Sequence, residues 1–552
     1  MRLQTASQPC RDSARADRLV SRSVLAAAIV ALGAVAVLLG SDGSGDLRNY
    51  HYYGGWALLN KPVGFDIAPA QLQTYIHPLL DSIYYRVLRW LNAYPRLFTF
   101  VWAIPQALAV WAVYHVAHLS FAFMPSGRRT VAILAALIGG SGAAALSVAG
   151  TSMSEAIPDL ALLGAVWLVL RADQAGRLGE SHWRRYAGAG LLAGAAAALK
   201  LTTTPYLIAF GPAIVAMKLL EPRLPRWGGL LAFAAGVAAS LAVIGGPWWL
   251  AVYRVFGNPL YPFYNAVFHS PYFPPVNIFD SRFLPQTALE WLTYPVEWAF
   301  KPSRRSSEPL VRDPRILFEM IAAAALLASS IVARLRGGTA AVARIGGLAW
   351  CAAFAIVAYA LWLKTFSILR YAAALEMLSG VLVLGALALP LARLASRLVW
   401  PRLAVGLGIA AALIASLVLP TWERRRPYLD RVVSTDMPKL PADSTVLLVA
   451  TSEGAFLAPF EPVSVRFIGL NNNLVAPHRT IGLERLISQA IDGATGPLWS
   501  ISDPGQLTQA AGELLAMFGL RPTAECRPIT SSIAPPMSLC RLERIAQSPP
   551  RS

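Results

Sequence analysis

Charged residues are scarce in this chain. Only 14% of the 552 residues are charged, whereas 56% are hydrophobic, and the mean hydropathy is +0.50. Soluble globular proteins carry roughly 25% charged residues. The composition therefore excludes an ordinary soluble protein and predicts a polytopic membrane protein.

Cysteine is also sparse, with four in the whole chain. Cys10 lies in a basic N-terminal stretch and Cys351 in an apolar run, and the four show no spacing typical of a metal site. Cys526 and Cys540 lie close together near the C-terminus. If that region is on the oxidising side of the membrane, these two cysteines are expected to form a disulfide.

The net charge of +18 could suggest a nucleic-acid partner. The arginines, however, lie in short clusters between apolar runs, as expected for loops that stay in the cytoplasm. We therefore attribute the basic character to membrane topology and predict no nucleic-acid partner.

Segments of about 20 apolar residues can cross a bilayer. The qualifying windows are 24–40, 97–124, 131–150, 155–170, 187–220, 228–249, 315–333, 345–363, 371–392 and 403–420. The window 187–220 is too long for one crossing and has Lys200 in its middle. We expect it to form two short helices that meet at "KLTTTPY", which gives about eleven membrane helices.

The arginines also predict the orientation of these helices. The basic tail, residues 1–23, contains five arginines and should be cytoplasmic, and every second loop after it is again arginine-rich. The long polar segments 41–96, 250–314 and 421–552 are then extracytoplasmic. Residues 24–39 could instead be a cleaved signal peptide, but we expect a retained anchor.

Residues 421–552 differ from the rest of the chain. "STVLLVAT", "VSVRFIGL" and "GPLWSIS" predict short strands, and "GLERLISQAID" and "QLTQAAGELLAMFG" predict helices. This alternation favours a small α/β domain. The predicted fold is thus an all-α membrane domain over residues 24–420, followed by a small extracytoplasmic α/β domain.

The first outer loop opens with "GDLRNYHYYGGW", Gly45 to Trp56, directly after the first apolar run. Its Asp46 can lie at the membrane surface, partly desolvated, where a carboxylate can act as a general base. The aromatic stretch that follows favours helices in the interface plane. An aromatic belt with capping acids is the alternative explanation for this cluster.

Several motifs occur in an order that resembles a known group of enzymes. They are Asp46 followed by Tyr50, the segment "YIHPLL" (Tyr75 to Leu80), an acid after the third span, the run "GLLAGAAAALKLT", and an Arg-Tyr pair opening a late span. Over residues 20–400 the chain resembles the GT-C superfamily of polytopic glycosyltransferases, and most closely glycosyltransferase family 87 and related bacterial enzymes.

The resemblance implies an enzyme of the bacterial inner membrane that takes a sugar from a polyprenyl phosphate. The acceptor would be a glycolipid or cell-envelope glycan, its hydroxyl activated by Asp46, and the sugar would be transferred with inversion. Tyr50, His51 and His77 are the expected substrate contacts of the first loop. A membrane transporter or lipid flippase, or an assembly scaffold, is the alternative function.

A departing phosphate needs positive charge. Arg370 opens a late span, and its guanidinium suits a phosphate; a snorkelling interfacial arginine is the alternative. Tyr371 is its expected helper. Lys200 should either bind the same phosphate or form an ion pair with Glu155 or Glu376. We expect Asp46 and Arg370 to converge on one hollow on the outer side of the membrane.

Glu155 and Asp159 lie four residues apart at the outer start of a helix. They could cap the helix, but the resemblance makes Glu155 a candidate second catalytic acid. Paired acids also allow a divalent cation, but the acids are too scattered to favour one, so no metal or other cofactor is predicted.

The second outer loop contains "GNPLYPFYNAVFHSPYFPPVNIFDSRFLP". Its prolines forbid a continuous helix, so a folded aromatic lid is expected. His269 and Arg282 could contact the substrate there, or the lid could be purely structural.

Overall fold

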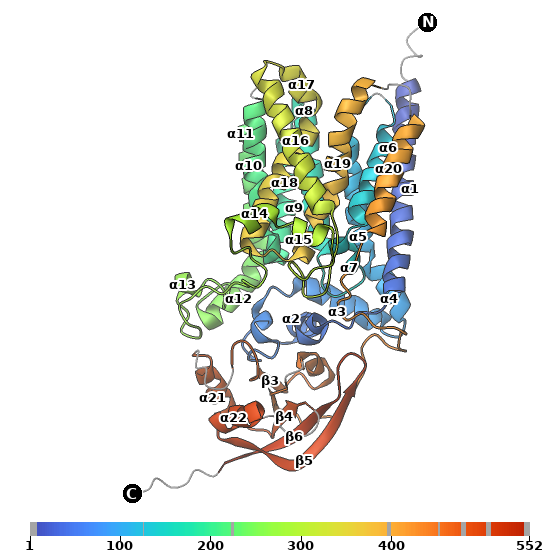
Figure 1. Cartoon of the computed structure of the whole chain (residues 1–552). Coiled ribbons are helices and arrows are strands. Elements are labelled where there is room, and N and C mark those ends of the chain that lie inside the picture. The colour runs from blue at the N-terminus through green and yellow to red at the C-terminus, as the bar shows by residue number, and fades with distance from the viewer. Residues whose placement is uncertain are drawn as a thin grey trace.

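The chain forms a long helical bundle with a small sheet domain at one end. The computed structural model describes residues 8–124, 126–221, 226–394, 399–450, 453–475, 482–503 and 509–545. The start of the first helix and the C-terminal sheet lie at opposite ends of the molecule (Figure 1). Two short helices of the first outer loop, α2 (Tyr52–Asn60) and α3 (Leu79–Leu91), lie between the bundle and the sheet.

Within the described residues, seven helical segments are long and apolar enough to cross a membrane. They are Arg15–Leu39, Pro95–Ser120, Leu201–Leu220, Trp227–Phe256, Arg315–Leu335, Gly346–Thr365 and Leu369–Leu389. These segments contain α1 (Gln8–Leu39), α4 (Pro95–Trp102) with α5 (Ile104–Ser120), α10 (Thr204–Leu220), α11 (Arg226–Ser240) with α12 (Gly246–Phe256), α16 (Arg315–Leu335), α18 (Gly346–Thr365) and most of α19 (Ala373–Leu394). Their length and hydropathy identify a membrane protein.

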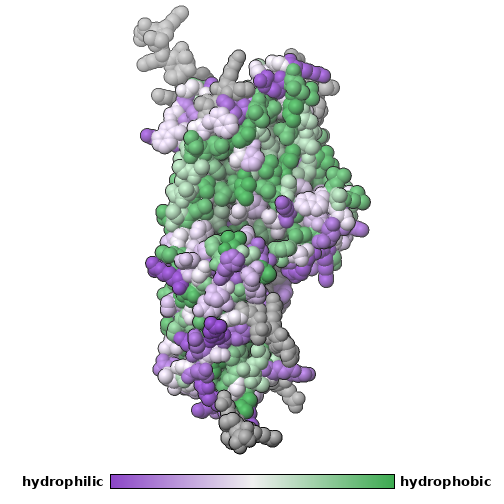
Figure 2. Space-filling view, turned by 90° about the vertical axis from the view of Figure 1, so that its left-hand side faces the viewer, coloured by the Kyte–Doolittle hydropathy of each residue, from purple (hydrophilic) through white to green (hydrophobic). Residues whose placement is uncertain are grey.

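Four further helices pack against these segments: α6 (Arg128–Gly140), α8 (Ala156–Arg177), α9 (Trp183–Leu199) and α20 (Val399–Ala415). They lie in the windows where additional crossings were expected, but they do not meet the same length and hydropathy criteria. A count of eleven crossings therefore stays a prediction. Figure 2 shows a broad apolar band over the bundle, with polar side chains gathered above and below it.

The window 187–220 is broken as predicted. Helix α9 ends at Leu199, Lys200 is extended with ψ near 104°, and α10 begins at Thr204 after a single 3₁₀ turn. Pro205 stands in the first turn of α10, where the missing N–H costs nothing. The two helices meet beside the loop that carries Glu155, with which Lys200 forms an ion pair.

Ion pairs hold the opposite end of the bundle together, where α1 begins. Arg129 lies 2.5 Å from Asp17, and Arg177 lies 2.8 Å from Glu221. The arginine-rich loops thus gather at one end of the molecule and the long polar segments at the other. The orientation of these two ends relative to a membrane stays a prediction.

The C-terminal domain is built on a six-stranded mixed sheet in the order β1-β5-β6-β4-β2-β3. Its strands are β1 (Thr435–Asp436), β2 (Thr445–Leu448), β3 (Arg466–Gly469), β4 (Leu498–Ser502), β5 (Leu520–Ser531) and β6 (Met537–Arg544). The helices α21 (Glu484–Asp492) and α22 (Gln509–Met517) form where the sequence predicts them. The long hairpin of β5 and β6 was not predicted.

The sheet is buried on both faces at its parallel strands β2, β3 and β4, which explains the continuous apolar runs there. Along β2, Leu447 packs with α21 and α22, whereas Val446 and Leu448 pack with the first outer loop. That second core also contains Tyr52, Tyr84 and other aromatic residues of the loop. The C-terminal domain is therefore continuous with the membrane domain through this shared core.

The first outer loop also covers the edge strand of the sheet. Ile67 pairs with Ile468 of β3 in parallel. Beside it, Lys61 and Asp66 form a buried ion pair of 2.9 Å, and Asp66 accepts a hydrogen bond from the backbone N–H of Phe467. The open edge of the sheet is thereby satisfied by the loop that carries Asp46.

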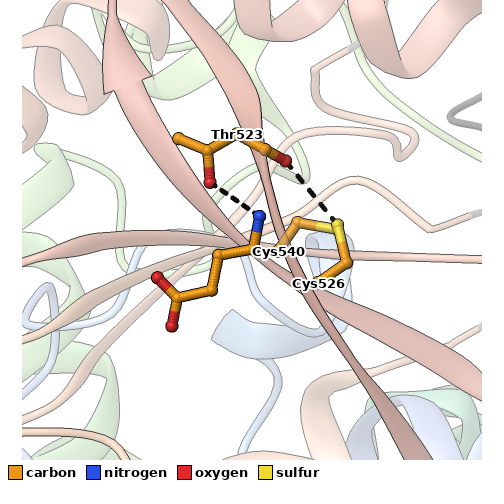
Figure 3. The surroundings of a disulfide bond; sticks show 4 residues. Thr523, Cys526 and Cys540 are labelled. Atoms are coloured by element: carbon orange, nitrogen blue, oxygen red, sulfur yellow. Dashed lines mark hydrogen bonds between the residues drawn. A yellow bond between two sulfur atoms is a disulfide. The ribbon is translucent and has the colours of Figure 1, made fainter.

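Cys526 and Cys540 form a disulfide with a Cα–Cα distance of 4.1 Å. They are directly opposite each other on the antiparallel strands β5 and β6, as Figure 3 shows. The bond that the sequence predicted thus joins two paired strands.

Candidate active site

The backbone that presents Asp46 is fixed by short-range polar contacts. Helix α1 ends at Leu39, and Gly40 adopts φ 106°, where a Cβ would come within 2.6 Å of the carbonyl oxygen of Arg425. The Asp42 carboxylate then accepts hydrogen bonds from the backbone N–H groups of Ser44 and Ser152, at 2.9 and 2.7 Å. Asp46 follows as the residue before a short π-helix, Leu47–His51.

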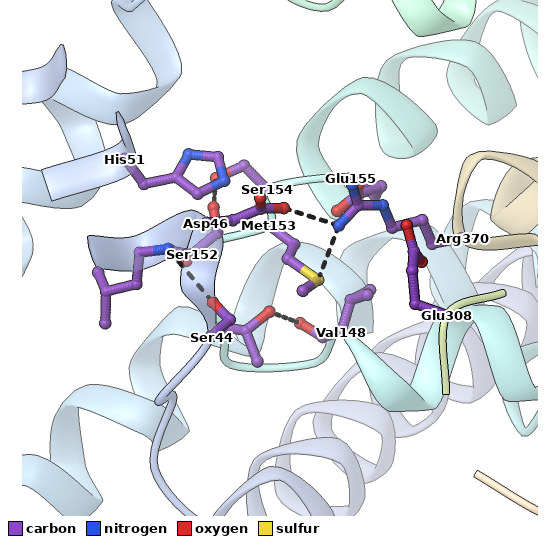
Figure 4. Close-up of polar contacts among 12 residues, drawn as sticks. Ser44, Asp46, His51, Val148, Ser152, Met153, Ser154, Glu155, Glu308 and Arg370 are labelled. Carbon is purple, nitrogen blue, oxygen red and sulfur yellow. Dashed lines mark hydrogen bonds and ion pairs between the residues drawn. The ribbon is translucent and has the colours of Figure 1, made fainter. Parts of the chain in front are cut away.

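Asp46 and Arg370 meet in an ion pair. Nη1 of Arg370 donates to Oδ2 of Asp46 at 2.8 Å, as Figure 4 shows. The Asp46 side chain is 26% exposed and that of Arg370 is 12% exposed. The structure thus brings these two side chains into contact, and the carboxylate is the more exposed of the two groups.

Aromatic and sulfur atoms surround the Arg370 guanidinium. It lies 5.1 Å from the ring centre of Tyr371 and 5.3 Å from that of Trp422, and Nη1 also approaches the sulfur of Met153 at 3.5 Å. Cation–π contacts of this kind stabilise a partly desolvated cation. Nε of Arg370 is buried without a hydrogen-bond partner among the described residues, which leaves one N–H free for a ligand.

Lys200 also lies near the Tyr371 ring, 5.9 Å from its centre. Its Nζ donates to Oε1 of Glu155 at 2.7 Å and to the carbonyl oxygen of Met153 at 2.6 Å. Of the two ion-pair partners considered for Lys200, the structure provides Glu155. Glu376 instead accepts hydrogen bonds from the backbone N–H groups of Ala144 and Ala145.

Glu155 precedes α8 but makes no capping hydrogen bond to it. Capping therefore does not explain this residue. Its second oxygen, Oε2, and Oδ2 of the neighbouring Asp159 are buried without partners among the described residues. Two acids and one lysine thus lie together beside the Asp46–Arg370 pair.

The electrostatics of the site keep Asp46 ionised. Burial by itself would raise its pKa, but the charge of Arg370, with smaller effects of His51 and Lys200, outweighs burial and lowers the pKa below its usual value. The neighbouring Tyr50 behaves differently, because burial and the Asp46 charge both raise its pKa well above the usual value. Tyr50 therefore remains a neutral hydroxyl at physiological pH.

His51 lies at the end of the same π-helix and is 3% exposed. Its ring is 4.0 Å from the ring of Tyr50, centre to centre, and its Nδ1 is 2.6 Å from Oδ1 of Asp81 in α3. Asp81 is itself buried. The aromatic-belt explanation thus does not account for His51.

The other predicted substrate-binding residues lie at the edge of this cluster or outside it. Arg282 is exposed and pairs with Asp280 and Glu308 at 2.6 and 3.5 Å, and Figure 4 shows Glu308 beside Arg370. His77 is hydrogen-bonded to the carbonyl oxygen of Ile244 at 3.0 Å. His269 is exposed at the end of α13 (Asn265–Phe268), away from the other candidates.

The described part of the chain contains no group of three or more His, Cys, Asp or Glu side chains placed to hold a metal ion. A groove lies elsewhere, between α6, α16, α19 and α20, and its walls include Ile138, Phe318 and Leu413. That groove does not include Asp46 or Arg370, so the predicted shared hollow stays a prediction.

Several residues of the cluster were not among the predicted site residues. Asp159 was visible in the sequence only as the neighbour of Glu155 at a helix start, and Asp81 only as an isolated acid. Met153 and Trp422 have no local signal, because their role depends on contacts with Arg370 from distant segments.

No protein family model matches this sequence, and no curated protein matches it. Among solved structures, the chain is similar to the crystal structure of the Archaeoglobus fulgidus oligosaccharyltransferase in its apo form. The identity is 15% and the TM-score 0.45, and the match covers 87% of this chain and 69% of that one. A likeness at this level carries no statement about family or activity.

Proposed function

We propose that this protein is an integral-membrane glycosyltransferase of the GT-C type. It transfers a sugar from a polyprenyl phosphate to a glycolipid or cell-envelope glycan. The observation that carries the proposal is the 2.8 Å contact of an accessible carboxylate, Asp46, with a largely enclosed guanidinium, Arg370. These are the two groups that the reaction requires: a base for the acceptor and a cation for the leaving phosphate.

The ion pair also suggests how the donor activates the site. An incoming lipid phosphate competes with Asp46 for Arg370, since a guanidinium binds phosphate and carboxylate through similar paired hydrogen bonds. As Arg370 turns to the phosphate, Asp46 loses the charge that lowers its pKa and becomes a stronger base. Base strength therefore rises only when the donor is present.

The transfer step is a single displacement. The acceptor hydroxyl oxygen attacks the anomeric carbon from the face opposite the phosphate, and its proton passes to Asp46. The bond between the anomeric carbon and the phosphate oxygen breaks, and its electron pair leaves with the polyprenyl phosphate. Arg370 neutralises the charge that develops on this phosphate, and the new glycosidic bond has inverted configuration.

The neighbouring residues complete the site. Lys200 provides a second cation for the phosphate and, like Arg370, contacts the Tyr371 ring. Glu155 holds Lys200 and, through its unpaired oxygen, can orient the acceptor. Tyr50 provides a neutral hydroxyl, and Arg282 lies at the edge of the cluster, where it can contact the substrate. No metal ion takes part in this mechanism.

In this proposal the protein lies in the bacterial inner membrane with the N-terminus in the cytoplasm. The loops 41–96 and 250–314 and the domain 421–552 are extracytoplasmic, and the donor enters from the outer leaflet. The apolar band of the bundle (Figure 2) is the surface that faces lipid.

The proposal is tested with purified protein in liposomes. Radiolabelled polyprenyl-phosphate sugars are supplied together with glycolipids from a strain in which the gene for this protein is deleted. In such a strain the acceptor glycolipid has not yet received the sugar. We expect label in the glycolipid fraction with wild-type protein and none with Asp46→Asn. Movement of the labelled lipid across the bilayer without transfer would support the transporter alternative and overturn the proposal.

A further inference from the structure

The pair His51 and Asp81 has features that the proposed transfer step does not yet use. We infer that His51, oriented by Asp81, is a second proton acceptor of the site, which takes the acceptor proton on from Asp46. This inference rests on the proposed function.

The first observation is an open ring nitrogen. Nδ1 of His51 is 2.6 Å from the Asp81 carboxylate, but Nε2 is buried and has no hydrogen-bond partner among the described residues. A buried polar atom without a partner costs about 1–3 kcal/mol. A histidine with a purely structural role is normally satisfied at both nitrogens, so the open nitrogen points to a ligand or a proton that is absent from the free enzyme.

The second observation is the backbone that carries the ring. Residues 47–51 form a π-helix, with hydrogen bonds between residues five apart. His51 therefore lies about one helical turn after Asp46, on the same side of the helix. Figure 4 accordingly shows the His51 ring beside Asp46.

The chemistry follows from these positions. Asp81 accepts the Nδ1 proton, so the lone pair of the neutral ring is on Nε2. After the displacement, Asp46 holds the acceptor proton in a site filled by both products. The proton moves to Nε2, the Asp81 carboxylate stabilises the resulting imidazolium, and Asp46 is ionised again. His51 releases the proton to water when the products leave.

The charged and titratable groups around His51 are consistent with this role. Asp81 faces it from α3, Asp46 lies on its own helix, and Tyr50 lies against its ring. The cations of this region are paired elsewhere: Arg370 is held by Asp46, and Arg48 of the same π-helix is held by Glu423 and Glu453. Two acids thus lie close to the His51 ring, one at each side of the proposed proton path.

Three variants test the inference in the liposome assay. His51→Gln keeps an amide that can bond to Asp81 but cannot accept a proton, and Asp81→Asn removes the orienting carboxylate. His115→Gln is the matched control, because His115 is a partly buried, hydrogen-bonded histidine in α5 that belongs to no site. Thermal unfolding in detergent establishes that each variant is folded.

We expect kcat to fall about 100-fold or more in His51→Gln and in Asp81→Asn, the size of effect typical of proton transfer. The KM for the donor should change less than about threefold, and the double variant should be no slower than the slower single variant. In His51→Gly, added imidazole should restore part of the rate, which it would not do for a structural residue.

An unchanged kcat in His51→Gln overturns the inference. The inference is also overturned if the variant loses catalytic efficiency only through a higher KM, or if imidazole does not accelerate His51→Gly. These outcomes all require an active wild type. If the wild-type protein transfers no sugar, the proposed function itself is wrong, and the two failures are thereby distinguishable.

Discussion

Asp46 and Arg370 are 324 residues apart in the chain, yet their side chains are in contact at 2.8 Å. One follows the first helix of the bundle and the other precedes α19. The pair is stabilised by burial of the guanidinium among Met153, Tyr371 and Trp422. It thus joins both ends of the membrane domain at the place where we propose that transfer occurs.

Asp46→Asn should abolish transfer without loss of folding. The amide is similar in shape but cannot accept a proton, so we expect a rate lower by roughly 10²- to 10⁴-fold. The measurement is initial transfer rate in liposomes, with Asp436→Asn on the exposed strand β1 as the control. Equal turnover in Asp46→Asn and wild type would remove Asp46 from the mechanism.

Arg370→Gln should raise the pKa of Asp46. Burial disfavours the ionised carboxylate, and without Arg370 only the smaller effects of His51 and Lys200 oppose burial. In the wild type the lowered pKa means that this ion pair stabilises the fold above the unfolded pKa of about 3.9. That stabilisation is lost as the pH falls through the lower, folded value. In Arg370→Gln the carboxyl should protonate at higher pH.

The carboxylate band in infrared spectra recorded across a pH titration reports this shift. The double variant Asp46→Asn/Arg370→Gln identifies the band, because a protein without the Asp46 carboxylate should not show that band. A titration of Asp46 that is identical with and without Arg370 would contradict the electrostatic assignment.

Lys200→Met should destabilise the protein by about 3–5 kcal/mol, the usual effect of leaving one buried charge unpaired. Glu155 is 4% exposed and would keep its charge without Lys200. The double variant Lys200→Met/Glu155→Gln should recover much of the lost stability, because neither charge is then left alone. Thermal unfolding in detergent measures the stability of both variants. A double variant less stable than Lys200→Met would contradict a stabilising ion pair between Lys200 and Glu155.

Replacing Cys526 and Cys540 by serine should lower the stability of the C-terminal domain by about 2–4 kcal/mol. The bond encloses a sequence separation of 14 residues, so its loss frees that stretch in the unfolded chain. Limited proteolysis should cut the β5–β6 hairpin faster in the variant. Mass spectrometry of the unreduced wild type should show the two cysteines linked, and free thiols there would contradict the pairing.

Chelation should leave transfer intact. The mechanism relies on Arg370 and Lys200 for the phosphate, so activity after treatment with EDTA should equal that of the untreated protein. Loss of transfer in EDTA, restored by a divalent cation, would show that a metal shares this role.

The helices and the main strands followed closely from the sequence. The break at Lys200 was predicted because a window of that length cannot cross once and because it has a charged residue in its middle. The strands β2, β3 and β4 were visible as short apolar runs. The hairpin of β5 and β6 was missed, since Pro522 and Pro528 lie within it and argue locally against a strand.

The site was only partly predictable for a different reason. Asp46 stood out because an acid beside an apolar run is unusual, and Arg370 because it opens a span. Asp81 and Trp422 carry no such signal. Their importance arises from a hydrogen bond to His51 and a ring contact with Arg370, which only the packed chain creates.

By itself, the sequence determined that this is a membrane protein with its basic loops at one end, since the thickness of a bilayer and the cost of burying charge act on local stretches of chain. The tertiary structure alone decided which acid meets which base. Asp46 could have remained free, and Lys200 could have paired with Glu376. Those choices depend on how distant helices and the C-terminal sheet pack around the first outer loop, and no local pattern encodes that packing.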